Sequence, residues 1–147
     1  MKKFNFSLAS VAILRAHKEA IAREALAAAV RSCSGVEAHL SEVRLRLSEM
    51  ESRRSAGRSG RFRAADDVSF FLAYRRECES EAEVQKQLSA ALSEVDTRRS
   101  ACVEANRAVK AIERLKSTCF ETYRAHALRT EQAEFDEIAG RRRAIST

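Results

Sequence analysis

The chain has 147 residues, with no proline, no tryptophan and four glycines, and 33% of the residues are charged. Because proline and glycine most disfavour a helix interior, this composition favours long helices, and much of the apolar content is alanine, which argues against a compact globule. The net charge of +6 permits attraction to acidic partners, but acids and bases interleave and no long basic run indicates a nucleic-acid partner.

The first helix is expected from about Ser7 to about Ser52. Ser7 is the expected N-cap, with Phe6 and Val11 at hydrophobic-staple spacing. From Ala22 onward, apolar residues alternate spacings of four and three, which predicts a coiled-coil seam with a left-handed supercoil. Before it, the residues of an adjacent stripe, which we interpret as a stutter or a broader apolar face, are Leu8, Val11, Leu14, Lys18, Ile21 and Ala25. The predicted seam comprises Ala22, Leu26, Ala29, Cys33, Val36, Leu40, Val43, Leu47 and Met50.

The periodicity stops between Ser52 and Asp67, and residues 53–66 are the predicted bend of a helical hairpin. This stretch holds Gly57, Gly60 and five arginines. The second helix is expected to begin with Asp66 or Asp67 as its cap. Four large apolar residues follow at once, and they cannot all face one narrow seam. Some should pack beside the end of the first helix, and the remainder form either a small local core or a docking patch: Phe70, Phe71, Leu72 and Tyr74.

The second helix is expected to run from about 67 to 140, with Gly140 as its C′ residue. Its seam includes one polar interruption, Arg98, of the kind that fixes register in coiled coils. A hairpin folded near residue 60 pairs residues whose numbers sum to about 120, so the second helix should overhang the first by about 27 residues, or roughly 40 Å. Such an overhang should fray, self-associate or bind a partner. The predicted seam comprises Val84, Leu88, Ala91, Val95, Arg98, Cys102, Ala105, Val109 and Ile112.

No pattern of reactive residues predicts an enzyme, a metal site or a cofactor. The four cysteines form no CxxC pair and none is expected to meet another in the hairpin, so we predict free thiols in a reducing cytoplasm. The overhang carries an acidic cluster followed by three arginines, Arg141 to Arg143. Without a pocket to shield it, this cluster is better explained as a solvated face or a protein contact than as a catalytic site. It comprises Glu131, Glu134, Asp136 and Glu137. No stretch approaches the ~20 apolar residues of a membrane span, and the charged residues after Leu14 argue against a secretory signal.

Both ends of the chain resemble the FliJ family of flagellar export proteins, related in role to the YscO-type stalk proteins of type III secretion. Near the C-terminus, the resemblance rests on residues 107–116 (RAVKAIERLK), Tyr123 and residues 131–139 (EQAEFDEIA). The start fits a pattern like FxFxLxxVxxLRxxxExxAxxxL, through Phe4, Phe6, Leu8, Val11, Leu14, Arg15, Glu19, Ala22 and Leu26.

The resemblance implies an all-α, long antiparallel two-helix coiled-coil hairpin with a C-terminal helical overhang, similar to the stalk of a rotary ATPase. It implies a cytoplasmic, non-enzymatic protein at the inner face of the bacterial membrane. Its termini would enter the hexameric export ATPase, its bend would reach the cytoplasmic domain of the membrane export gate, and it would escort export chaperones. The implied ATPase contact falls on Phe4, Phe6, Leu8, Arg15, Glu131, Asp136, Glu137 and Ile138. The implied gate contact falls on Phe70, Phe71 and Tyr74.

Two other classes stay open from the sequence. One is a generic structural or adaptor coiled coil, dimerising through the overhang. The other is a protein that binds nucleic acid or anionic membranes through the arginines of the bend and tail. The sequence does not distinguish a flagellar system from an injectisome.

Overall fold

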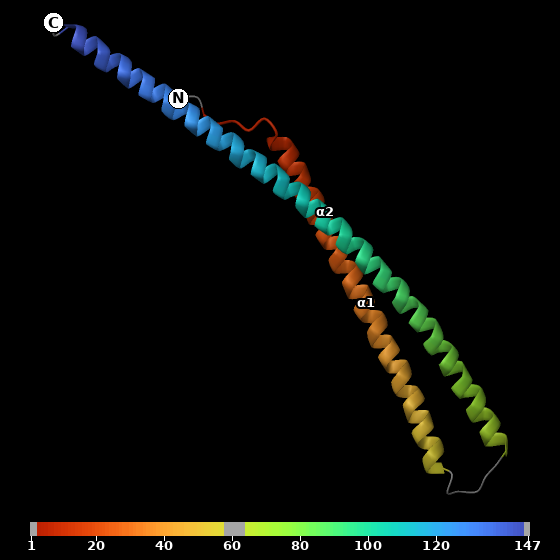
Figure 1. The fold of residues 1–147 in the computed structure, drawn as a ribbon. Helices are drawn as coiled ribbons and strands as arrows, with labels where there is room; N and C mark the ends of the chain where they lie inside the picture. The colour runs from red at the N-terminus through yellow and green to blue at the C-terminus, as the bar shows by residue number, and fades with distance from the viewer. Residues whose placement is uncertain (1–2, 58–63, 146–147) are drawn as a thin grey trace. The chain divides into compact units, whose positions relative to one another are not determined.

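The computed structural model describes residues 3–57 and 64–145, with side chains for 3–57 and 65–141. It contains two helices, α1 (Ala9–Gly57) and α2 (Ala64–Ile145), and no strand within these residues. The helices pack against each other in opposite directions (Figure 1). The predicted all-α helical hairpin is therefore confirmed.

The ends of the helices differ from the predicted ones. The first helix starts at Ala9 rather than at a Ser7 cap, because the buried Phe6 turns the chain there and its carbonyl accepts the Ala9 N–H at 3.1 Å. It then continues to Gly57. The predicted bend at 53–66 thus overlaps the helix ends, and Gly60 lies outside the described residues.

Gly140 does not end the second helix, which continues to Ile145. None of the described glycines has a positive φ, so Gly140 does not adopt the left-handed conformation of a C′ residue. Arg141 donates to Glu137 at 2.5 Å, an i,i+4 pair that spans this glycine and supports the helical turn.

The chain divides into two compact units. The bend unit comprises Ile21–Cys102, and the terminal unit comprises Met1–Ala20 with Val103–Thr147. Each contains a segment of α1 and a segment of α2.

In the bend unit, the predicted seam of α1 is confirmed. All nine predicted positions are buried or half-buried, and Val43 is completely buried. On α2, Val84 and Val95 are buried. Arg98 does not lie in the seam as predicted: it is exposed, and its Nε donates to Glu94 Oε1 at 2.6 Å. A long, charged side chain reaches solvent from the edge of a narrow interface, so this position interrupts the apolar contact without burying a charge.

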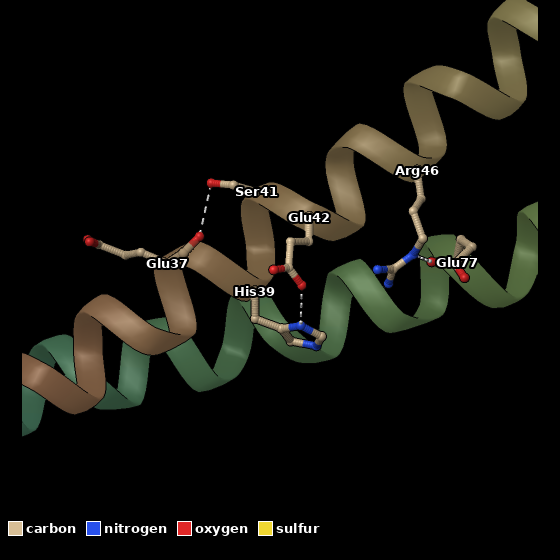
Figure 2. A network of polar contacts seen from close by, with 6 residues as sticks. All are labelled: Glu37, His39, Ser41, Glu42, Arg46 and Glu77. Atoms are coloured by element: carbon tan, nitrogen blue, oxygen red, sulfur yellow. Dashed lines mark hydrogen bonds and ion pairs between the residues drawn. The ribbon is translucent and has the colours of Figure 1, made fainter.

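Polar pairs along the bend unit join α1 to α2. Figure 2 shows Arg46 donating from Nε to Glu77 Oε2 at 3.2 Å, and Arg44 makes the same kind of bond to Glu81 at 2.8 Å. The numbers of such partners sum to about 125 rather than about 120. Long side chains lean toward the N-terminus of their own helix. On two antiparallel helices, this lean brings together residues whose numbers have a larger sum than those of residues directly opposite each other in the backbone.

In the terminal unit, α1 faces α2 with both apolar and polar residues. Val11, Arg15 and Glu19 are half-buried, whereas Leu8 and Leu14 are exposed. At the start of the bend unit, Ile21 of the predicted stripe is also exposed, whereas Ala25 is half-buried. The predicted stripe is therefore only partly buried, through Val11 and Ala25, because polar side chains of α1 find hydrogen-bond partners on α2 and take inner positions.

Candidate interaction surfaces

The bend unit carries a cluster of aromatic residues at the start of α2. Phe70 stacks with Tyr74 at 5.8 Å between ring centroids and meets Phe71 edge-on at 6.0 Å. From α1, the guanidinium of Arg54 lies 4.3 Å from the centre of the Phe71 ring and 5.0 Å from that of Phe70. A cation at this distance from an aromatic ring contributes about 0.5–1 kcal/mol at an exposed site. Arg54, Phe70, Phe71 and Tyr74, with Glu51, are called the bend cluster below.

Tyr74 is tied to α1 by a hydrogen bond across the helix pair. Its hydroxyl donates to Glu51 Oε1 at 2.7 Å. Because the bond requires the protonated phenol and the nearby carboxylate opposes a phenolate, Glu51 raises the pKa of Tyr74 to about 12. The tyrosine therefore stays neutral, and the bond persists, through the physiological pH range.

The interpretation of these aromatics as a small local core holds in part, and their interpretation as a docking patch stays a prediction. Phe70 and Tyr74 are half-buried against the end of α1, as a local core would be. Phe71, Leu72 and Val68 are exposed and form the outer side of the same helix start. The three residues implied as gate contacts thus lie together, and Phe71 is the one most open to a partner.

The terminal unit holds a second aromatic cluster, formed by the segment before α1. Phe4 meets Phe120 edge-on at 5.3 Å and Tyr123 at 5.5 Å between centroids, and Phe6 is buried. Edge-on aromatic pairs of this kind add about 0.5–1.5 kcal/mol beyond the area they bury. Phe4 therefore fastens the N-terminal segment to α2, and Phe6 is buried close by, although the resemblance implies both as partner contacts.

Arg15 also bonds within the helix pair. Its Nη1 donates to the carbonyl oxygen of Ala108 at 3.0 Å, and one helical turn further Asn106 Nδ2 donates to Glu19 Oε1 at 3.3 Å. Both bonds are partly shielded from solvent, so each links α1 to a defined position on α2. Of the N-terminal residues implied as partner contacts, only Leu8 is exposed.

Ile13 is an exposed apolar residue that the sequence patterns did not single out. Its side chain is 71% exposed, and the neighbouring Leu14 is also exposed. A heptad count gives the residues of one seam, and Ile13 lies outside every stripe that was counted. The sequence feature that could have identified Ile13 is a large aliphatic residue at a position beside the seam rather than in it.

The last part of α2 is another exposed apolar surface of the terminal unit. The contacts of the N-terminal segment reach Tyr123, and beyond it Leu128, Phe135 and Ile138 are exposed. Among the acidic residues, Asp136 accepts from Gln132 at 3.0 Å and Glu137 pairs with Arg141, while Glu131 is half-buried. Asp136 and Glu137 are bonded along the helix surface, and Ile138 lies exposed beside them.

Reactive groups do not gather among the residues that the structure describes. All four cysteines are free thiols. Residues 3–57 and 64–145 contain no group of histidine, cysteine and carboxylate side chains that could hold a metal ion. Within the same residues, no helix is long and apolar enough to cross a membrane.

These features define a class: a helical-hairpin protein with apolar side chains exposed in both of its units. Comparison with known proteins gives the family. The model of the flagellar FliJ protein family matches residues 4–145. The chain therefore belongs to the FliJ family and is a component of the flagellar export apparatus. The family is a structural export component and not a known enzyme. No curated protein and no solved structure matches the chain.

Proposed function

We propose that this protein couples the hexameric export ATPase to the cytoplasmic domain of the membrane export gate, without catalytic activity of its own. In this proposal it acts as one hairpin in the cytoplasm, at the inner face of the bacterial membrane, and is held there by its partners. It promotes assembly of the ATPase ring and handles export chaperones. Membership of the FliJ family supports a role in flagellar export. The exposed apolar residues of the two units support separate contacts with the ATPase and with the gate.

The observation that carries the proposal is the uncovered end of α2. Helices buried on one side usually hide their large apolar residues, yet Phe135 and Ile138 are exposed beside bonded carboxylates. Large exposed apolar groups rimmed by charge are typical of protein-binding surfaces. We assign the ATPase contact to these two residues with Asp136, Glu137 and Leu8, and place Glu131 at its edge. Phe4, Phe6 and Arg15 shape the helix pair that presents them.

The ATPase assignment is tested by the steady-state hydrolysis rate and the hexamer fraction of the cognate export ATPase, with the purified chain titrated in. The chain should raise both. Truncating Phe135 and Ile138 to alanine should raise the concentration for half-maximal stimulation by about tenfold or more, as removal of central apolar contacts does. Leu45→Ala, an equally exposed aliphatic of the bend unit, is the matched control and should change nothing. A helical wild-type chain that leaves hydrolysis unchanged would refute the proposal.

The gate contact is assigned to the bend cluster, through Phe71 with Phe70 and Tyr74 behind it. Exposed Phe71 is held by Arg54, so its ring is already ordered before a partner arrives, which lowers the entropy cost of binding. Phe71→Ala should weaken binding of the purified cytoplasmic domain of the gate, measured by calorimetry, without altering ATPase stimulation. Equal binding by Phe71→Ala and wild type would remove this residue from the contact.

A further inference from the structure

The tail of α2 carries an apolar stripe that is organised for pairing with another helix. Leu128, Phe135 and Ile138 are 57%, 67% and 53% exposed, respectively. They follow one another at spacings of seven and three, so they lie on one side of the helix at heptad positions. This stripe resembles one half of a coiled-coil interface rather than three scattered surface residues.

The charges beside the stripe are complementary to those of a second copy. Glu134 and Arg141 are one heptad apart, so they occupy the same flank of the stripe. In an antiparallel pair of tails centred between residues 136 and 137, Glu134 of each copy lies near Arg141 of the other. The same register places Phe135 opposite Ile138, and two-fold symmetry makes every contact occur twice.

We propose that this tail pairs antiparallel with the same segment of a second copy of the chain. The tail surface consists of Leu128, Glu134, Phe135, Ile138 and Arg141. Glu134 and Arg141 are both exposed, and no described residue pairs with Glu134. Arg141 already donates to Glu137, but a guanidinium has five N–H donors and serves two carboxylates at once.

The alternative parallel pairing is disfavoured by the acidic cluster. Glu131 is half-buried and lies at a heptad position of the stripe, between Leu128 and Phe135. In a parallel pair it would face the same residue of the second copy, with Glu134, Asp136 and Glu137 of both chains at the same level. Like charges in contact destabilise helix pairs, whereas the antiparallel register places the Glu131 residues of the two copies at opposite ends of the paired segment. Asp136 and Glu137 come level there, but they lie at heptad positions that point away from the partner helix.

The interface is short, so the dimer is weak and reversible. Two Phe135–Ile138 layers and two ion pairs bury far less area than a standard interface, and we expect a dissociation constant of ~100 µM. This inference does not depend on the proposed function. If both hold, the second copy covers the residues assigned to the ATPase, and binding of the ATPase should dissociate the dimer.

The test is sedimentation of the full chain over a concentration series, with helicity checked by circular dichroism. Glu134→Arg should weaken the dimer about tenfold, because two attractions become two repulsions. Arg141→Glu should do the same. An equimolar mixture of the two variants should regain wild-type association, since each supplies the charge that the other lacks. Glu113→Arg makes the same change in net charge elsewhere on α2 and should leave association within about twofold of wild type.

Three outcomes would overturn the inference. The first is a wild-type chain that stays monomeric up to about 1 mM, where even very weak pairing becomes visible. The second is a dimer that Glu134→Arg does not weaken, which would place the contact on another surface. The third is a mixture of Glu134→Arg and Arg141→Glu that associates no better than either variant alone, which would exclude the antiparallel register.

Discussion

Val43 offers the sharpest test of the helix pair, because its side chain is the largest that is completely buried among the described residues. Val43→Ala removes two methyl groups from the seam of the bend unit. At about 0.8 kcal/mol for each buried carbon, the lost transfer free energy is about 1.6 kcal/mol. A remaining cavity adds to this, although a two-helix interface closes in more easily than a globular core. We expect a loss of about 2 kcal/mol in unfolding free energy.

Urea unfolding followed by helical circular dichroism measures this loss. With an m-value of about 2 kcal/mol/M, the midpoint should fall by about 1 M. Leu45→Ala is the control, because Leu45 lies on the same helix but is 61% exposed. Its effect should stay within about 0.5 kcal/mol, as for most surface positions. Equal midpoint shifts for the two variants would refute the assignment of the seam.

Two further predictions concern polar contacts between the helices. Arg15→Met keeps the aliphatic stem but removes the hydrogen bond to the Ala108 carbonyl. It should lower the unfolding free energy of the terminal unit by about 1–2 kcal/mol, as measured by urea unfolding. An unchanged unfolding midpoint would show that the bond contributes nothing to stability. In Glu51→Gln, the pKa of Tyr74 should fall from about 12 toward the ordinary tyrosine value, as read from phenolate absorbance. Since the pKa is raised in the folded chain, the stabilisation from this bond is complete below about pH 10 and is lost as the pH rises toward 12. The stability advantage of wild type over Glu51→Gln should therefore disappear in that window, and an advantage that persists at higher pH would contradict the mechanism.

The sequence alone determined the helices and most of the seam. Without proline, and with apolar residues at alternating spacings of four and three from Ala22 to Met50, little but a helical pair satisfies the pattern. The overhang followed from the same count, because α2 is much longer than the segment it can pair with. These features depend on local helix propensity and on the spacing of apolar residues, and both can be read directly from the sequence.

The tertiary structure decided which side chains remain free for partners. Sequence patterns could not show that Phe4 packs on Phe120 and Tyr123, or that Arg15 reaches a backbone carbonyl of α2. Such contacts join residues about a hundred positions apart, and they depend on the register and on how far each side chain leans. For the same reason, the exposure of Ile13 and of Arg98 became visible only with both helices in place. Periodicity gives the side of a helix that is buried, whereas the facing helix determines which residues on that side it covers.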